Sequence, residues 1–469
     1  MNNRKYRSWA IWIIAVVSVI GCDDFVEVEA PDHKIVSGSV FATEETAKAA
    51  IQGIYNEMAT ANFSNGDLYS ITVLAGLSSD IFTTSSNTDT RYGPFQQNEL
   101  SPIGSDDATA NYNLWSSAYN IIYMANSVLE GVEGSNTIGD GTKGVVRGQA
   151  LFIRALTYFY LTNLYGDVPL ALTTDYRQNS TSSRAPSAEV WGQIAADLDT
   201  TMELLEGEND YADSERTHIN LFAAVALRAR VHLYQQNWAS AEERSGQVID
   251  QISLYGLPED LDQVFLMNSR EAIWQISPLG RDGVTNYTGE GYFFRGNNAS
   301  RIRLAEGFLE SFPAADERSS HWIGFNESRS FHFPQKYKDG SFGQSVTEYS
   351  MVLRLAEQYL IRAEARAMQG NLSGAMTDLD KIRERAGLGA IAGSDPEIGQ
   401  QALLDSIMEE RKRELFSEWG HRWFDLKRTG RASTVLMPLK PLWQDTDTRY
   451  PIPGEERAKN PNLGQNDGY

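Results

Sequence analysis

Two short segments of the sequence repeat one helix–turn–helix pattern. Residues 233–241 (LYQQNWASA) and residues 367–375 (AMQGNLSGA) place an asparagine, Asn237 or Asn371, at the same position. Asparagine favours turns, and the alanine three places after the next bulky residue lets two helices approach closely. Each segment therefore predicts an antiparallel pair of helices. Because over a hundred residues separate the two, they predict helix pairs wrapped by an irregular insertion rather than a continuous solenoid.

Apolar residues recur at helical spacing along much of the remaining chain. Residues 145–165 are apolar almost all round, which predicts a helix at the centre of the fold that ends at Gly166. Further helices are expected at 42–58 with Thr43 as N-cap, and at 112–132, 188–205, 219–236, 239–251, 350–368, 372–386 and 401–418.

Residues 254–345 have a different texture, rich in Gly, Asn, Ser and aromatic residues, with a strand-like stretch at 271–276. The tail from Arg431 is rich in Pro and Asn and is expected to pack as extended chain. The expected fold class is mainly α: tetratricopeptide-like helix pairs with a large, irregular, loop-rich region that carries short strands.

The charge balance limits the function. The chain has 41 Lys and Arg against 62 Asp and Glu, a formal net charge of −21. A surface of this sign repels nucleic acid and anionic lipid, which argues against phosphate binding. Residues 139–144 (GDGTKG) match the G-x-G-x-x-G string of dinucleotide-binding proteins, but no predicted strand precedes them. They are therefore expected to form a loop that leads into a helix.

The N-terminus has the pattern of a secretory signal peptide. Basic side chains within residues 1–9 precede an apolar run from Ala10 to Ile20, which is too short to cross a bilayer. The run ends just before Cys22, the only cysteine. A small residue before a lone cysteine resembles the bacterial lipobox, so residues 1–21 are expected to be removed and Cys22 to be lipidated. The alternative is an ordinary cleaved signal with an incidental cysteine.

An acidic cluster follows this cysteine at residues 23–29 (DDFVEVE). It resembles the export tag that carries some lipoproteins to the outer leaflet of the outer membrane, and a solvated tether is the alternative. Two or more acyl chains on one residue anchor a protein firmly. The protein is therefore expected to be anchored to a membrane without spanning it.

No constellation for metal or nucleophilic catalysis stands out. The six histidines include no H-E-x-x-H pair, and no G-x-S-x-G elbow is present. One cysteine provides neither a disulfide framework nor a thiolate zinc site. The acidic loops at 208–213 and 445–447 lack the order of an EF-hand and are expected to be solvated. No metal, cofactor or enzymatic activity is expected, although 62 acidic residues leave a glycosidase carboxylate pair open.

Residues 411–428 (RKRELFSEWGHRWFDLKR) form the most regular segment of the sequence. An apolar stripe of Leu415, Trp419 and Trp423 lies among opposite charges on nearby turns. This pattern predicts a core helix followed by a corner that ion pairs hold together, in preference to a catalytic site.

Aromatic residues gather in loops where no periodicity demands them. A sugar ring offers an apolar C–H face and polar edges, which suits aromatic platforms beside amide and charged groups. The loops at 89–98 and 286–295 and the stretch 320–323 therefore supply the candidate ligand-binding residues, with core packing as the competing interpretation for each ring. These candidates are Arg91, Tyr92, Phe95, Tyr287, Tyr292 and Trp322.

Five motifs in order resemble the SusD/RagB family of outer-membrane lipoproteins, and together they run nearly end to end. They lie at residues 22–25, at 147–155 continuing to 164–170, at 354–365, at 410–426 and at 460–469. Asp467 stands where many relatives have proline. The resemblance divides the chain into a signal peptide (1–21), a SusD-like N-terminal helical region (22–253) and a C-terminal region with a loop-rich ligand-face insertion (254–469).

The resemblance also implies a function. Relatives lie as a lid on a TonB-dependent, SusC-like barrel and capture nutrients, often glycans, without catalysis. The chain is thus expected to be a surface-exposed, lipid-anchored outer-membrane protein that binds an oligo- or polysaccharide and delivers it to such a transporter. The motifs are mainly scaffold and carry no ligand residue over. A surface glycosidase and a peptide-binding tetratricopeptide scaffold are the alternatives.

Overall fold

The computed structural model describes residues 40–86, 88–211, 214–280, 285–296, 301–343 and 345–469. Residues Phe41–Tyr469 form one compact unit. The predicted signal peptide, Cys22 and the acidic cluster at 23–29 lie outside the described residues, so they stay predictions. Within the part of the chain that the structure describes, no helix combines the length and hydropathy needed to cross a membrane.

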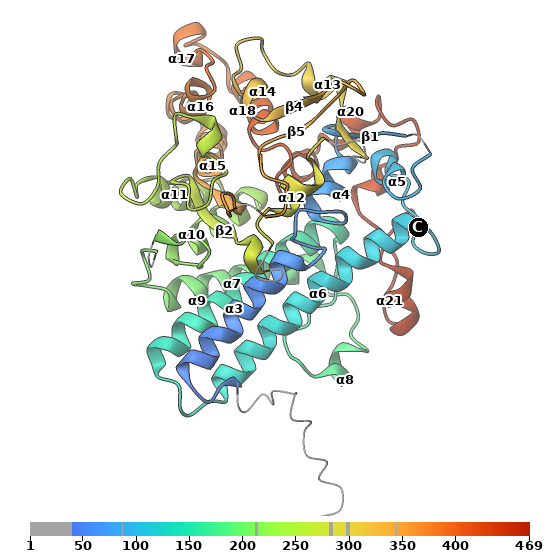
Figure 1. The fold of residues 1–469 in the computed structure, drawn as a ribbon, viewed down its shortest axis with the longest axis vertical. Coiled ribbons are helices and arrows are strands. Elements are labelled where there is room, and N and C mark those ends of the chain that lie inside the picture. Colours follow the sequence, from blue (N-terminus) through green and yellow to red (C-terminus); the bar gives the residue numbers. More distant parts are fainter. Residues whose placement is uncertain (1–39, 87, 212–213, 281–284, 297–300, 344) are drawn as a thin grey trace, which may run out of the picture. The chain divides into compact units, whose positions relative to one another are not determined.

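The first half of the unit is built on four long helices (Figure 1). They are α3 (Glu44–Thr60), α6 (Asp106–Glu133), α7 (Asp140–Tyr165) and α9 (Ser187–Leu204). Helix α7 packs against the other three and is buried along most of its length, as its all-round apolar sequence predicts. It ends at Gly166, whose φ of 75° favours glycine. Gly139 is its N-cap, so the glycine string opens a helix and follows no described strand.

Helix α3 begins as predicted, after Thr43. The Thr43 hydroxyl accepts from the Thr46 backbone N–H at 3.3 Å. In return, the Thr46 hydroxyl accepts from the Thr43 backbone N–H at 3.3 Å. The two bonds complete a capping box with threonine at the position where Glu or Gln is usual.

The two predicted helix pairs are both present, and their turns are nearly identical. Asn237 has φ −83° and ψ 71°, and Asn371 has φ −83° and ψ 70°. The residue before each asparagine has a positive φ, 58° at Gln236 and 81° at Gly370. The pairs consist of α10 (Leu221–Tyr234) with α11 (Trp238–Ile249) and of α15 (Leu355–Met368) with α16 (Leu372–Arg385).

The pairs lie directly against each other, which the sequence analysis did not expect. Helix α11 packs on α15, with Ala241 of the first pair buried among Ile361 and Ala365 of the second. Arg366 Nε also lies 2.8 Å from the Glu242 carboxylate. The chain leaves the helical stack after α11, forms the insertion, and returns to continue the same stack, so the pairs are separated in sequence but adjacent in space.

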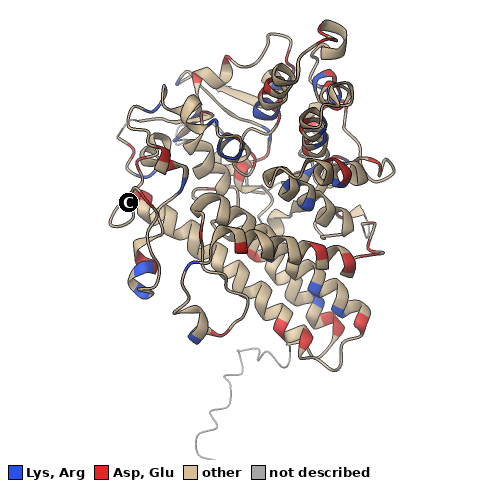
Figure 2. Cartoon of the chain, turned by 180° about the vertical axis from the view of Figure 1, so that it is seen from behind, with Lys and Arg blue, Asp and Glu red and all other residues tan. Residues whose placement is uncertain are grey.

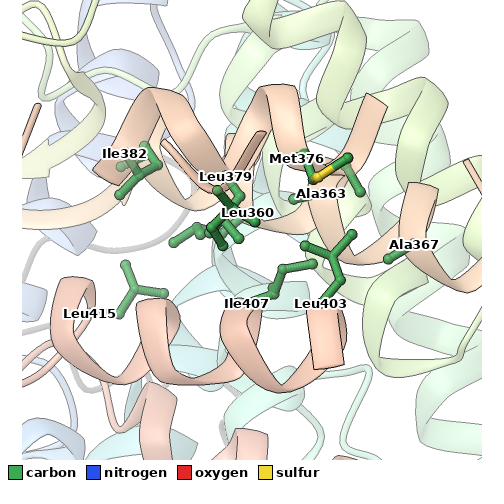
Figure 3. Close-up of a cluster of buried hydrophobic side chains, with 12 residues drawn as sticks. Leu360, Ala363, Ala367, Met376, Leu379, Ile382, Leu403, Ile407 and Leu415 are labelled. Atoms are coloured by element: carbon green, nitrogen blue, oxygen red, sulfur yellow. The ribbon is translucent and has the colours of Figure 1, made fainter. Parts of the chain in front are cut away.

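A second apolar core closes the end of this stack. In Figure 3 the side chains of α15, α16 and α18 (Gln400–Glu414) point toward one another between the helices. Leu360, Leu379 and Leu403 are each fully buried. Helix α18 ends at Glu414, before the predicted end at 418, because the chain turns a corner in which Gly420 has φ 71°.

The strands in the described part of the chain form three separate antiparallel pairs. They are β1 (Phe82–Thr84) with β3 (Ile302–Leu304), β2 (Ala272–Ile276) with β6 (Ser350–Arg354), and β4 (Ile323–Asn326) with β5 (Phe331–Pro334). Strand β2 confirms the strand-like stretch at 271–276. Residues 350–354 correct a prediction: they continue the sequence pattern of α15 but form β6, because all five pair with or lie against buried β2.

Short helices connect these elements. They are α4 (Ile71–Ser78), α5 (Gly93–Gln97), α8 (Tyr176–Asn179), α12 (Gly289–Phe293), α13 (Glu306–Leu309), α14 (Arg318–His321), α17 (Ile391–Ser394), α19 (His421–Arg428), α20 (Ala432–Leu436), α21 (Gly454–Lys459) and the 3₁₀ turns η3 (Leu261–Gln263), η4 (Pro278–Gly280) and η5 (Asp445–Thr448). Because α20, η5 and α21 lie in the tail, its predicted extended form is only partly right. The tail docks on the long helices, where the Asn466 amide donates to the Tyr165 carbonyl at 2.9 Å.

Charged residues of both signs are interspersed along the ribbon when the unit is viewed from behind (Figure 2). The corner after α18 shows how the buried ones pair. Arg411 Nε lies 2.8 Å from Asp425, and Arg428 contacts both Asp425 at 2.7 Å and Glu364 at 2.6 Å. The predicted core helix with a corner held by ion pairs is confirmed.

The cluster of Figure 3 makes the stability of the stack testable. Leu379→Ala should lower the free energy of unfolding by about 2–5 kcal/mol, because it removes a fully buried side chain and leaves a cavity. Urea denaturation measures the change. Leu439→Ala is the matched control: its side chain is 60% exposed, so the change should stay within about 0.5 kcal/mol.

Candidate functional site

The structure brings the two predicted aromatic loops together at the short helix α12. The Tyr92 and Phe293 rings meet edge to face, with centroids 6.3 Å apart. Tyr92 immediately precedes α5, and Phe293 ends α12, so loops separated by almost two hundred positions share one contact.

Helix α12 is wedged tightly between two other backbone segments. The Thr288 hydroxyl caps it by accepting from the Gly291 N–H at 3.0 Å. A Cβ atom at Gly289 would lie 1.8 Å from the Asn65 carbonyl oxygen, and one at Gly291 would lie 2.2 Å from the Asp339 carbonyl oxygen. Only glycine permits such close approach of two backbones. The two glycines of α12 therefore fix its position between these two backbone segments.

Helix α12 and its neighbours present a cluster of rings, which we call the aromatic face (Tyr287, Tyr292, Arg295 and Phe342). Tyr287 and Tyr292 stack with centroids 5.0 Å apart and an interplanar angle of 15°. Phe342 meets Tyr287 edge on at 5.1 Å. Tyr292 is 36% exposed and Phe342 is 67% exposed, whereas Tyr287 is 6% exposed. Tyr287 thus supports two rings that solvent reaches.

An arginine borders the aromatic face. The Arg295 guanidinium carbon lies 4.2 Å from the centroid of the Tyr292 ring. Its Nη1 donates to the Gly340 carbonyl at 3.2 Å, which holds the side chain in place. A fixed guanidinium beside a half-exposed ring offers hydrogen-bond donors at the edge of an apolar surface. This combination suits a ligand with both apolar and hydroxyl-bearing faces.

A second cation–ring pair lies on the Tyr92 side of α12. The Arg91 guanidinium carbon lies 5.3 Å from the Tyr69 ring centroid and 5.8 Å from that of Tyr92. Arg91 and Tyr69 are both half-buried, and Leu68 beside them is 40% exposed. Arg91 therefore remains accessible at the surface, as a binding role requires.

A buried carboxyl group lies on α12, the helix that carries Tyr292 of the aromatic face. Glu290 on α12 is 4% exposed and accepts from the Ser350 hydroxyl at 2.7 Å through Oε1. Its Oε2 has no hydrogen-bond partner among the described residues. Burial raises the pKa of Glu290 to about 7, the Ser350 hydroxyl opposes the rise, and the carboxylates of Asp67 and Glu418 add to it.

Three of the sequence candidates are core residues. Tyr92, Phe95 and Trp322 are each 0% exposed. Phe95 packs edge to face on Tyr450 with centroids 5.5 Å apart. A ring without an exposed face cannot stack on a sugar, so the structure corrects the expectation of direct stacking by these three. Their loops gather rings because the irregular region needs an apolar core of its own, which composition cannot distinguish from a binding surface.

Trp322 shows the physical reason most clearly. Its indole Nε1 donates to the Leu261 carbonyl at 3.1 Å, and its ring packs edge to face on Phe265 at 5.5 Å. The Lys336 ammonium lies 4.7 Å from the Trp322 ring centroid. Burial lowers the pKa of this lysine to about 8, although Glu418 favours its charged form. The indole thus lines a buried ion network.

This buried ion network joins four segments of the chain. Arg354 contacts Glu271 at 2.7 Å, Glu414 at 2.6 Å and Glu418 at 2.8 Å. Arg318 of the insertion contacts the same Glu414 at 2.9 Å. Burial opposes ionisation of Glu414, but the surrounding arginines and Lys336 hold its pKa well below its usual value. The network stays charged and structural.

Sequence reasoning missed Phe342, the most exposed ring of the aromatic face. It stands in a glycine-rich turn (DGSFG), and the ring that precedes it in the sequence, Tyr337, is buried. The signal that could have found it is a bulky aromatic residue isolated among turn residues, where no core position is available.

Among the described residues, one group of side chains has the composition of a metal site: Asp260, Asp262 and His321, whose candidate ligand atoms lie within 4.8 Å of one another. The Lys338 ammonium, however, already lies 3.0 Å from the Asp262 carboxylate. Both aspartates are exposed. A cation in this place competes with a metal ion, so we assign the group no ligand.

Comparison with known proteins identifies the family. Residues 24–233 match the family described as "Starch-binding associating with outer membrane", and residues 316–469 match the SusD family. The chain is 24% identical to SusD-like protein P25 of Formosa agariphila, covering 99% of this chain and 98% of that protein. It is 25% identical to the starch-binding protein SusD of Bacteroides thetaiotaomicron, covering 69% of this chain and 72% of that protein.

Solved structures share the fold. Surface glycan-binding protein A of Bacteroides thetaiotaomicron, solved in complex with laminarihexaose, superposes with a TM-score of 0.74 at 19% identity, covering 90% of this chain and 99% of that one. A helical stack with an irregular insertion is thus the architecture of a known class of proteins. The chain belongs to the SusD/RagB family, as its motifs indicate.

Trp322 provides a test of its structural role. Trp322→Ala should lower the free energy of unfolding by about 3–5 kcal/mol, because it removes a fully buried ring beside buried charges. Chemical denaturation measures the change, and Phe325→Ala, at a 51% exposed ring, is the control. A variant with unchanged stability that loses only ligand binding would restore Trp322 as a ligand contact.

The raised pKa of Glu290 predicts that the free energy of unfolding depends on pH. Its carboxyl titrates near 4.5 when unfolded and near 7 when folded, so within that window the folded protein keeps a proton that the unfolded chain has released. The stability contributed by this group therefore falls as pH rises through the window.

Glu290→Gln stays neutral and removes this slope. The free energy of unfolding of the wild type minus that of the variant should fall by about 3 kcal/mol between pH 4.5 and 8, measured by urea denaturation. Glu133→Gln, at a 73% exposed side chain, should leave the slope of the wild type unchanged. A pH-independent difference between wild type and Glu290→Gln would contradict the assignment.

Proposed function

We propose that this protein is a surface-exposed, lipid-anchored outer-membrane protein that binds an oligo- or polysaccharide and delivers it to a TonB-dependent, SusC-like transporter. The observation that carries the proposal is the aromatic face, where Tyr292 and Phe342 expose ring surface beside Arg295. Relatives in the family are described as starch-binding or solved with a glycan bound. Family membership and an exposed ring cluster together favour a glycan as ligand.

The geometry suggests how a sugar is held. Phe342 and Tyr292 both contact Tyr287, one edge on and one stacked, so their exposed surfaces differ in direction. Two rings that face different directions fit successive sugars of a curved or branched glycan better than those of a flat, straight glycan. The Arg295 guanidinium then donates to hydroxyl or ring oxygens at the edge. The individual affinity can be weak, because a transporter beneath the protein raises the effective concentration of captured ligand.

The anchor and the transporter belong to the same proposal. Lipidation at Cys22 and an export signal at residues 23–29 place the protein at the outer leaflet, facing the cell exterior. The aromatic face then receives the glycan from outside the cell. The division into regions 22–253 and 254–469 likewise stays a prediction, in which the second region carries most of the ligand face.

We propose binding without turnover. A glycosidase needs two carboxyl groups that reach the scissile bond. Glu290 on α12 and Asp67, whose carboxylate adds to the rise of the Glu290 pKa, are only 4% and 9% exposed. Their burial favours a supporting role over proton transfer to a ligand.

The binding test uses the soluble chain that starts after Cys22 and a glycan panel. Tyr292→Ala and Phe342→Ala should each weaken binding of the best glycan about ten-fold, which corresponds to ~1.4 kcal/mol of lost stacking. Isothermal titration calorimetry measures the change. Tyr176→Ala is the matched control, because this ring is 71% exposed on α8, which lies at the lower right of the folded unit in Figure 1, well apart from α12.

One result would overturn the proposed function, and a second would overturn the proposed site. Hydrolysis of the bound glycan by the purified protein would replace a binding role with a catalytic one. A glycan that binds equally well to the wild type and to both variants would retain the function but remove the aromatic face as its site.

A further inference from the structure

A concave surface on the helical stack shares no residue with the aromatic face. It lies along α9, α10 and α11 and encloses about 870 Å³. Met202, Leu221 and Phe222 on its floor are half-buried, and Val225 between them is buried. We call this surface the α10 groove. Small-molecule and peptide sites in proteins have volumes of this order.

The two ends of the α10 groove carry side chains of opposite charge. Helices α10 and α11 form an antiparallel pair, so the start of α10 lies beside the end of α11. The Phe222 and Tyr255 rings, 6.2 Å apart, confirm this arrangement. The Leu221 N–H also donates to the Glu208 carbonyl at 3.0 Å, which brings the end of α9 to the same place. This end of the groove therefore holds the carboxylates of Glu203, Glu206 and Asp250.

The opposite end is basic. Arg228 and His232 lie one turn apart on α10, and Arg244 faces them from α11. Asp199 binds Arg228 with two bonds of 2.8 and 3.1 Å, which neutralises one of the two arginines. Arg244 contacts only the Gln247 amide at 3.1 Å and lies in no ion pair among the described residues. Burial first, then Arg228 and Arg244, lowers the pKa of His232 to about 4, so His232 is neutral.

The distance between the opposite charges follows from helix geometry. Arg244 and Asp250 lie six positions apart along α11, which is about 9 Å along the helix axis. The groove thus offers three carboxylates, an apolar floor and an uncompensated arginine in that order. A ligand complementary to it carries positive charge, apolar side chains and negative charge along about 9 Å.

We propose that the α10 groove binds a peptide segment of a partner protein in which basic residues and acidic residues flank a short apolar stretch. An extended chain covers about 9 Å with about three residues, which matches a single short segment. A neutral glycan fits poorly, because Phe222 is the only aromatic ring among the described lining residues and is half-buried. Charge complementarity also fixes the direction of the bound segment.

Two synthetic peptides test the proposal directly. One has two lysines, Leu-Ala and two glutamates in that order, and the other has the reverse order, each with a fluorophore and blocked ends. Fluorescence anisotropy with the chain that starts after Cys22 should show saturable binding and a preference for one order. An isomer with alternating lysine and glutamate should bind at least ten-fold more weakly.

A charge swap provides the decisive variant. The double substitution Arg244→Glu and Asp250→Lys reverses the polarity of the groove at two surface positions and should reverse which peptide order is preferred. Arg177→Glu on exposed α8 is the matched control and should change neither affinity. Circular dichroism of each variant verifies that the helices are intact.

Three outcomes of these measurements contradict the peptide proposal. Equal binding of all three peptides, no binding of any, or a preference that survives the charge swap would each overturn the proposal. Tyr292→Ala should leave peptide binding unchanged. The proposal for the α10 groove and the proposal for the aromatic face are therefore tested independently.

Discussion

The fold depends on one buried point of contact, the salt bridges between Arg354 and the glutamates around it. Arg354 ends β6 and caps α15, Glu271 precedes β2, and Glu414 ends α18. Their side chains are at most 2% exposed. Charges taken out of water are costly unless every one is paired, and removal of one partner typically costs about 3–5 kcal/mol. Since Arg318 of the insertion binds the same Glu414, the helical stack and the irregular region are held at one place.

That arrangement explains why an irregular region can carry a precise surface. In its described residues the insertion has only two-stranded sheets and short helices, so its local structure alone would not be stable. The buried ion network and the aromatic core around Trp322 fix its base against the stack. The close backbone contacts at Gly289 and Gly291 then position α12, and with it Tyr292. Order is transmitted from the helices to the aromatic face through packing rather than through regular secondary structure.

The candidate site was predictable only in part. The sequence located the two loops that meet at α12, and Tyr287 and Tyr292 do form one cluster. It did not separate these rings from Tyr92 and Trp322, because aromatic residues without periodicity mark an irregular core as readily as a binding surface. Phe342 escaped notice because a single exposed ring has no pattern. Exposure depends on which distant segments cover a side chain, and local sequence does not record that.

By itself, the sequence determined what depends on neighbours along the chain. The helix pairs, the asparagine turns and the cap at Thr43 all follow from interactions within a few residues. Only the tertiary structure decided what depends on distant partners. Residues 350–354 became a strand because β2 was available to pair with them, and the two helix pairs became neighbours because α11 and α15 share an apolar contact. Burial is a property of the whole fold, so the division between core rings and surface rings appeared only there.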